Sequence, residues 1–316
     1  MKNRIFVNYG GVLIGGLYGL AMRIFFDMHL GDLVDLFSIT FVWIVPMVIG
    51  LIPLVFATHE QLKGWSFRMS RPILSVLTFF IFCYSTQLED IICLIIISFP
   101  FLLVAAGTGV ILGELIIQYR KKRGILFSVF LLPFLTGVIE PTFTTPAEIV
   151  ETRSSVVIDA DHEKIWDNIV RVPEIRSAEY KKGFLNRAGI PRPLYAELDK
   201  DTLGGNRVGH FEGGLAFQEK IIRWEKNKEV TFNIKIIPSA NSTTIFERHM
   251  LHGQHVEFLN ATYLLTEQGD GKIELSLITK YQLTTKINFY GKLWGHFMLT
   301  DFQERLLAVI KSRCEK

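Results

Sequence analysis

The stretch IICLIIISFPFLLVAAGTGVILGELIIQY, residues 91–119, decides the fold class of the first half of the chain. Its single charged side chain is Glu114, close to the C-terminal end. An α-helix rises about 1.5 Å per residue, so about 20 apolar residues cross the hydrocarbon core of a bilayer. This stretch exceeds one crossing, which predicts a transmembrane helix that tilts or bends, with Pro100 as the kink position.

Further apolar stretches flank it and predict a membrane all-α bundle of about five helices. The third and fifth stretches are shorter than a full crossing and would require local thinning of the bilayer. A cleavable signal peptide is the alternative for the N-terminal stretch, but it lacks an A-x-A site and more apolar segments follow. The predicted spans are residues 5–26, 36–57, 72–87, 91–119 and 125–139.

Charge divides the chain in two. Of 34 Lys and Arg and 31 Asp and Glu, residues 1–151 hold ten of each. This predicts a transmembrane helical domain over 1–140, a linker rich in Pro and Thr over 141–151, and a globular domain over 152–316. The net charge is +3 and no dense basic patch stands out, which argues against nucleic acid as a partner.

The loops between the predicted spans alternate in charge, which predicts the orientation in the cell membrane. The basic loops hold Lys2, Arg4, Lys63, Arg68, Arg71 and residues 120–123, and the acidic loops hold Asp27, Asp32, Asp35, Glu89 and Asp90. Basic loops face the cytoplasm, so the N-terminus is cytoplasmic. Five spans then place the globular domain outside the cytoplasm, whereas re-entry of the third or fifth span would return it to the cytoplasm.

The small and ionisable residues inside the spans do not indicate a transport function. Arg23 and Glu114 lie near span ends, within reach of the interface, and no inverted repeat or broken helix pair indicates a transporter. Glycines spaced by four residues allow helices to approach closely inside the bundle, with a dimer motif as the alternative. These glycines are Gly11, Gly15, Gly19, Gly109 and Gly113.

The second half predicts an antiparallel sheet covered by one helix. Asp161 can cap a short helix that ends before Pro173. Residues 288–314 carry apolar side chains at steps of three and four, which predicts one long amphipathic helix. Alternating apolar and polar residues predict strands. These strands are residues 153–159, 194–198, 205–212, 215–224, 229–236, 256–266 and 273–283.

Two segments carry a family resemblance: VVIDADHEKIW, residues 156–166, and YQLTTKINFY, residues 281–290, which runs into Trp294. Residues 152–316 resemble the SRPBCC, or START-like, superfamily, which includes polyketide cyclases and lipid-transfer proteins. The resemblance implies an α+β helix-grip domain, in which a curved antiparallel sheet wraps the long C-terminal helix and leaves an apolar cavity. The resemblance does not extend to the membrane half.

Candidate ligand-binding residues follow from strand parity and the resemblance. The expected cavity lining is Phe217, Phe232, Ile234, Leu277, Tyr281, Trp294 and Met298. The alternative is that these side chains fill the core completely. Polar candidates for the cavity are Arg207, His210, Glu212 and Glu219. Their alternative role is in structural salt bridges of the sheet.

A metal or an organic cofactor is not expected. His249, His252 and His255 could bind Zn²⁺, but they fall between strands, so a solvated hairpin tip is the favoured interpretation. Nucleophile elbows, phosphate-binding loops and dinucleotide fingerprints are absent from the sequence.

The function that these patterns favour is a membrane-anchored module that binds or transfers a hydrophobic, lipid-like molecule. Its expected partners are the bilayer and that molecule. One alternative is an enzyme of the cyclase or dehydrase type that acts in the helix-grip cavity. Another is a structural or signalling membrane protein that binds a protein partner, whose identity the sequence leaves open.

Overall fold

The computed structural model describes residues 2–30, 38–119, 128–237 and 255–316, with side chains described over 9–27 in the first of these ranges. The chain divides into two compact units, residues 1–145 and 146–316. We call them the helical unit and the mixed unit.

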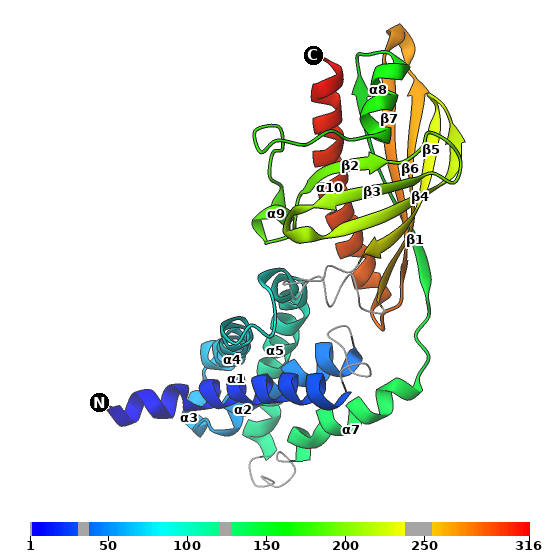
Figure 1. The fold of residues 1–316 in the computed structure, drawn as a ribbon. Coiled ribbons are helices and arrows are strands. Elements are labelled where there is room, and N and C mark those ends of the chain that lie inside the picture. The colour runs from blue at the N-terminus through cyan, green and yellow to red at the C-terminus, as the bar shows by residue number, and fades with distance from the viewer. Residues whose placement is uncertain (1, 31–37, 120–127, 238–254) are drawn as a thin grey trace. The chain divides into compact units, whose positions relative to one another are not determined.

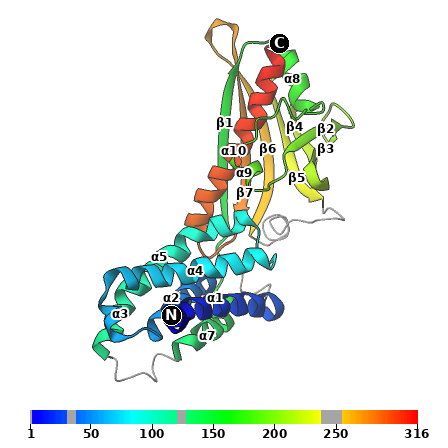
Figure 2. The same cartoon turned by 90° about the vertical axis from the view of Figure 1, so that its left-hand side faces the viewer.

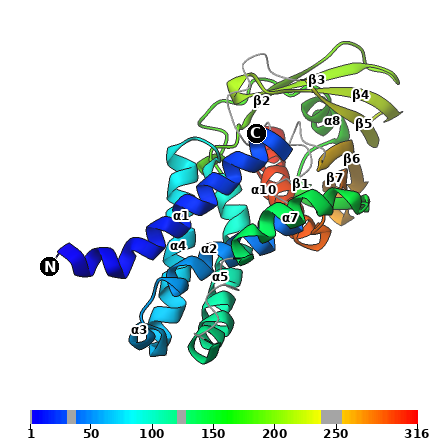
Figure 3. The same ribbon diagram turned by 90° about the horizontal axis from the view of Figure 1, so that it is seen from below.

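The helical unit is built from apolar helices (Figures 1 and 3). A π-helical turn, Thr40–Ile44, leads into the second helix, and 3₁₀ turns, Val129–Leu131 and Glu140–Thr142, flank the last one. The helices are α1 Lys2–Leu30, α2 Val45–Val55, α3 His59–Lys63, α4 Trp65–Ser85, α5 Ile91–Tyr119 and α7 Leu132–Ile139.

Among the described residues, three helices are long and apolar enough to cross a membrane: Tyr9–Asp27, Trp65–Ser85 and Ile91–Gln118. The segments Thr40–Val55 and Val129–Thr142 are apolar but shorter. Three of the five predicted spans are therefore long and apolar enough to cross a membrane, whereas the described parts of the second and fifth are shorter.

The third predicted span is longer than its sequence pattern indicated. It begins at Trp65 and not at residue 72, so Arg68 and Arg71 lie in the helix and not in a loop. The Arg68 guanidinium pairs with Glu114 of α5 at 2.5 Å, so its charge is compensated inside the helical unit. Hydropathy alone therefore placed the start of this helix too late, because it treats every charged residue as part of a loop.

The spaced glycines lie where helices of the unit approach one another. A Cβ atom at Gly11 would lie 2.8 Å from the Cα of Pro53 in α2, and one at Gly19 would lie 2.7 Å from the Phe79 ring in α4. These positions pack inside the bundle because a larger side chain would push α1 away from its neighbours.

One end of the helical unit carries acidic side chains, and we call it the acidic end. Buried Arg23 of α1 pairs with Glu89, in the α4–α5 connection, at 2.6 Å and with Asp27 at 3.3 Å. Buried Glu140 accepts hydrogen bonds from the backbone N–H groups of Ile39 (2.6 Å) and Thr40 (2.8 Å). Glu140 thereby caps, from a distant part of the chain, the helical segment that leads into α2.

The segment around α7 lies along the second half of α1 and ends at the acidic end. The Tyr18 hydroxyl donates a hydrogen bond to the Phe130 carbonyl (2.7 Å), and the Phe25 and Phe134 rings meet edge to face at 5.0 Å. Glu140 then reaches the acidic end. The described part of the fifth predicted span therefore covers the half of the bundle nearest that end.

The mixed unit contains one seven-stranded sheet in the order β1-β7-β6-β5-β4-β3-β2, with every neighbouring pair antiparallel. The predicted antiparallel sheet and long C-terminal helix are confirmed. The strands are β1 Glu148–Ile158, β2 Pro193–Leu198, β3 Asn206–Phe211, β4 Ala216–Glu225, β5 Glu229–Ile237, β6 Val256–Glu267 and β7 Ile273–Leu283. The helices are α8 His162–Val170, α9 Phe184–Arg187 and α10 Asn288–Cys314.

β1 is longer than predicted. It begins at Glu148, inside the range 141–151 that was predicted as linker, because Glu148 pairs with Leu283 at the end of β7. The linker pattern of prolines and threonines thus ends earlier than composition suggested.

α10 packs along β1 and β7, and α8 packs against its C-terminal part (Figure 2). The core between these layers includes Trp166 of α8, Leu275 of β7 and Ile310 of α10, all buried. A polar side chain is buried at the same interface: Gln303 of α10 donates to Thr279 Oγ1 (2.9 Å) and accepts from Ser154 Oγ (2.8 Å). These bonds fix the rotation of α10 against the sheet.

Candidate ligand-binding face of the mixed unit

Three of the predicted lining residues are fully buried. Phe232 and Leu277 belong to the filled core, with exposed fractions of 0% and 3%. Tyr281 is 1% exposed, and a Cβ atom at Gly295 of α10 would lie 2.5 Å from its hydroxyl oxygen. The sheet and α10 therefore touch at Tyr281 and leave no gap there for a ligand.

The other four, Phe217, Ile234, Trp294 and Met298, are half-buried. Phe217 meets the Phe211 ring at 5.1 Å and the Phe258 ring at 6.1 Å. We group the half-buried apolar residues on the inner side of the sheet and along α10 under the name aromatic face. It comprises Phe211 and Phe217 of β3 and β4, Ile234 and Phe258 of β5 and β6, and Trp294, Met298 and Phe302 of α10.

The aromatic face joins β3 to the middle of α10. The Phe211 ring stacks on Phe302 with centroids 6.0 Å apart, which shows that the inner side of β3 faces the helix. Further along α10, Leu306, Leu307, Val309 and Ile310 are buried. The second half of α10 is thus buried against the sheet. In the first half Tyr281 fills the contact at Gly295, but Trp294 and Met298 stay half-buried.

Sequence reasoning missed three members of this face for different reasons. Phe258 precedes a register shift between Phe258 and Asn260, and such a bulge breaks the parity rule that assigns faces. Phe211 ends β3 and continues the inward set Arg207–Gly209–Phe211, so parity could have found it. Phe302 was recognised in the apolar stripe of the helix but not as a lining residue.

Two of the predicted polar residues come together on the inner side of the sheet. Arg207 and Glu219 are register partners on β3 and β4 and form an ion pair. Arg207 is 4% exposed, and its guanidinium lies 4.9 Å from the centroid of Phe232. Its Nε atom is buried without a hydrogen-bond partner. Burial raises the pKa of neighbouring Tyr263, although the charge of Arg207 acts in the opposite direction.

The other two polar candidates have structural partners elsewhere. His210 stacks on Tyr195 with centroids 4.4 Å apart. Glu212 pairs with buried Arg192 at 2.7 Å, and Arg192 also donates to the Ile175 carbonyl at 2.9 Å. The pair Arg192–Glu212 holds the loop before β2 to the end of β3.

The predicted metal candidates do not form a described site. His249 and His252 lie outside the described residues, and His255 Nδ1 lies 3.1 Å from the Thr284 carbonyl oxygen. In the described parts of the chain, no group of three or more His, Cys, Asp or Glu side chains could hold a metal ion.

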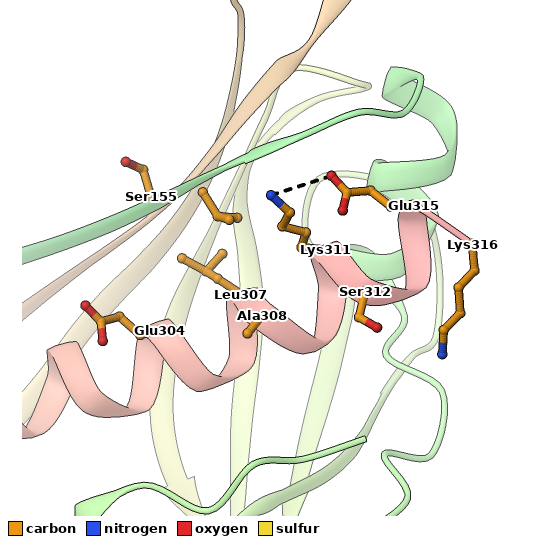
Figure 4. A pocket seen from close by; sticks show the side chains of 9 residues that line it. Ser155, Glu304, Leu307, Ala308, Lys311, Ser312, Glu315 and Lys316 are labelled. Atoms are coloured by element: carbon orange, nitrogen blue, oxygen red, sulfur yellow. Dashed lines mark ion pairs between the residues drawn. The ribbon is translucent and has the colours of Figure 1, made fainter. Parts of the chain in front are cut away.

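A separate groove of about 500 Å³ runs between β1 and the last turns of α10 (Figure 4). Lys311 crosses it, donating to the Val157 carbonyl (2.8 Å) and pairing with Glu315 (3.6 Å). None of the predicted lining residues contributes to it. It is lined by Ser155, Val156, Glu304, Leu307, Ala308, Lys311, Ser312, Glu315 and Lys316.

Comparison with known proteins gives low similarities. No family model matches the chain, and no curated protein matches it. Norcoclaurine synthase from Thalictrum flavum aligns at 13% identity and a TM-score of 0.33, covering 54% of this chain and 87% of the synthase. An uncharacterized protein from Rhizobium leguminosarum aligns at 12% identity and a TM-score of 0.33, covering 54% of this chain and 99% of that one.

A third solved structure, DynU16 from the dynemicin biosynthetic locus, aligns at 16% identity and a TM-score of 0.32, covering 52% of this chain and 48% of that one. TM-scores this low do not carry a family assignment. The helix-grip description therefore rests on the strand order and on the position of α10 in the mixed unit itself.

Proposed function

We propose that the protein is a membrane-anchored module that binds an apolar, lipid-like small molecule on the aromatic face of its mixed unit. The observation that carries this proposal is a contrast among the apolar side chains of α10 itself. Leu306, Leu307, Val309 and Ile310 in its second half are fully buried, whereas Trp294 and Met298 in its first half stay half-buried. Accessible apolar and aromatic side chains with a few polar groups nearby are the usual lining of a small-molecule site.

The aromatic face has the chemistry for an acyl chain or a ring system. Aromatic side chains supply large apolar contact area, and each half-buried ring that a ligand covers adds on the order of 1 kcal/mol. Arg207, with its unpartnered Nε atom, is a polar group on the same side of the sheet. A ligand with one polar end fits this combination better than a pure hydrocarbon.

We further propose that the helical unit spans the cell membrane and that the mixed unit lies outside the cytoplasm. The starts of α1 and α4 and the end of α5 share one end, which carries the basic residues Lys63, Arg68 and Arg71, and basic ends face the cytoplasm. Glu140 leaves the bundle at the opposite, acidic end. Only five residues, 143–147, separate the 3₁₀ turn Glu140–Thr142 from β1. In the proposed arrangement this short tether keeps the mixed unit near the bilayer, where the local concentration of a lipid-like ligand is high.

Reporter fusions after Thr145 test the orientation. We expect a periplasmic or extracellular reporter to be active there and a cytoplasmic reporter to be silent. Activity of the cytoplasmic reporter alone would contradict the proposed side of the mixed unit, without bearing on ligand binding.

Ligand binding is tested with the full chain in phosphatidylcholine nanodiscs and a fluorescent fatty acid as probe. We expect saturable binding that Phe217→Ala and Trp294→Ala weaken several-fold. Phe289→Ala is the matched control, because Phe289 is on the same helix as Trp294, outside the aromatic face, and 83% exposed. Absence of saturable binding, or equal loss in the control, would refute the proposal.

Acid–base catalysis is a second candidate function, favoured by one observation. Arg207, Glu219 and Tyr263 bring three ionisable side chains together on the inner side of the sheet. An enzyme of the cyclase or dehydrase type would use such groups to move protons on a bound ligand. Glu219→Gln would then abolish turnover while leaving binding of the fatty-acid probe unchanged, whereas a pure binding module has no turnover to lose.

A further inference from the structure

Arg71 of α4 is a cation without an ionic partner in the described part of the chain. Its guanidinium lies 4.2 Å from the ring centroid of Tyr9 of α1 and 5.2 Å from that of Phe67. Its Nε and Nη1 atoms are buried and have no hydrogen-bond partner. Two aromatic rings thus hold the guanidinium in place and leave two donors unused.

The carboxylates at this end of the helical unit are already paired. Glu114 is bound to Arg68 at 2.5 Å, and Glu60 is bound to Lys63 at 3.1 Å. Two buried donors without partners cost free energy, because neither water nor protein replaces their lost hydrogen bonds. Arg71 as a whole is only partly buried, so an anion from outside the chain can reach the exposed edge of its guanidinium and offset part of this cost.

The surroundings select the kind of anion. Tyr9 and Trp65 are about half exposed at the same end, and aromatic side chains of this type gather at headgroup level in membrane proteins. This is also the basic end, which by its charge faces the cytoplasmic leaflet, where anionic lipids concentrate. A phosphate that arrives on a lipid is held at this depth by its own acyl chains.

We propose that Arg71 binds the phosphate of an anionic phospholipid, with Tyr9 and Phe67 orienting the guanidinium. This site goes beyond the proposed ligand-binding function and lies in the other unit. It requires that the helical unit be embedded in a bilayer. The planar guanidinium offers two parallel N–H donors to a phosphate, which a lysine cannot match.

The test uses the full chain in nanodiscs of phosphatidylcholine with and without phosphatidylglycerol, with bound lipid counted by native mass spectrometry. We expect selective retention of phosphatidylglycerol, and about tenfold weaker retention in Arg71→Gln, as for loss of one charged hydrogen bond. Lys63→Gln is the matched control, because it removes one charge at the same end from an exposed side chain. Arg71→Lys, which keeps the charge, should retain part of the selectivity and covers the case in which Arg71→Gln does not fold.

Several outcomes would overturn the site. Equal losses in Arg71→Gln and Lys63→Gln would mean general surface attraction. Equal retention of phosphatidylcholine would remove the need for a charged lipid. Displacement of phosphatidylglycerol by millimolar inorganic phosphate would assign the site to a free anion. Phe217→Ala must leave the lipid count unchanged, so failure of the ligand-binding proposal is seen separately.

Discussion

Arg207 and Glu219 show what a buried ion pair implies for stability. Both groups lose water on folding, and each is tolerated because the other is present. Arg207→Met should therefore destabilise the mixed unit by about 3–5 kcal/mol, since it strands the Glu219 carboxylate. The double variant Arg207→Met with Glu219→Leu should recover most of that loss.

Urea unfolding of the full chain, followed by tryptophan fluorescence, measures this difference. Trp166 and Trp224 are suitable reporters because their rings meet at 5.0 Å in the core of the mixed unit. A single variant that loses less than about 1 kcal/mol would show that water reaches the pair.

The ion pair of Glu179 with Arg313 leads to a prediction of how the stability of the mixed unit depends on pH. Hydrogen bonds from the Arg313 guanidinium, and then from the Arg176 backbone N–H, lower the pKa of Glu179 from 4.5 to about 2. A carboxyl group whose pKa falls on folding stabilises the fold above its ordinary pKa, and this contribution is lost as the pH falls toward the folded value.

The melting temperature of the mixed unit should therefore fall between about pH 4.5 and pH 2, and Glu179→Gln should flatten that fall. Thermal unfolding of the full chain at a series of pH values checks both statements. Parallel curves for the variant and the original chain would mean that the Glu179–Arg313 bond contributes nothing in solution.

At the residue scale, the sequence predicted which side of the sheet a residue lies on better than it predicted which residues form ion pairs. Parity placed Phe232 and Leu277 on the inner side of the sheet, and both are there. The pairing of Arg207 with Glu219 depends on the register between β3 and β4, which alternation does not specify. The left-handed backbone of Gly213 (φ 74°) fits the predicted turn between these strands, because glycine adopts it without strain.

The contact between α10 and β7 leads to a prediction for these two elements. An alanine at Gly295 would favour the helix by up to about 1 kcal/mol in isolation. Here its Cβ atom would meet the Tyr281 hydroxyl at 2.5 Å, and overpacking of this kind costs about 1–3 kcal/mol.

Gly295→Ala should thus destabilise the mixed unit, and adding Tyr281→Phe should restore part of the loss by removing the hydroxyl. Urea unfolding of the single and double variants decides the matter. If Gly295→Ala raises stability by itself, α10 does not approach β7 as closely as described.

Element boundaries were predictable where the pattern is local. α5 and α10 have the bounds that apolar periodicity predicted, because both helices present a long uninterrupted pattern. α4 does not, because Arg68 and Arg71, which hydropathy placed in a loop, lie within the helix, where Arg68 pairs with the distant Glu114. Glu140 likewise accepts hydrogen bonds from Ile39 and Thr40, about a hundred residues away. Contacts between residues far apart in sequence leave no local signal.

At the scale of the whole molecule, we expect the two units to fold independently. The mixed unit has its own core, formed by α8, α10 and the inner side of the sheet. Residues 146–316 expressed alone should be soluble and monomeric and should unfold cooperatively, as circular dichroism and size-exclusion chromatography would show. An aggregated or molten fragment would contradict this division of the chain.

The division itself was readable from hydropathy and charge, since each half has the composition of a different solvent environment. Whether the second and fifth apolar segments cross a membrane was not readable. Residues 36–57 are long enough by sequence, yet the described helical segment is only Thr40–Val55, and the fifth segment is short in both descriptions. How far the inner side of the sheet is filled was also beyond the sequence, since packing depends on how the sheet curves around α10.

The strand order has a consequence for biosynthesis. β1 is the first strand to leave the ribosome, yet its partner, β7, is the last, with Ile158 opposite Ile273. The apolar side of β1 therefore waits uncovered while all the intervening strands are made, and the sheet closes late. A nascent chain interrupted before β7 would expose the unpaired edge of β1, which makes it a target for chaperones that bind exposed strands.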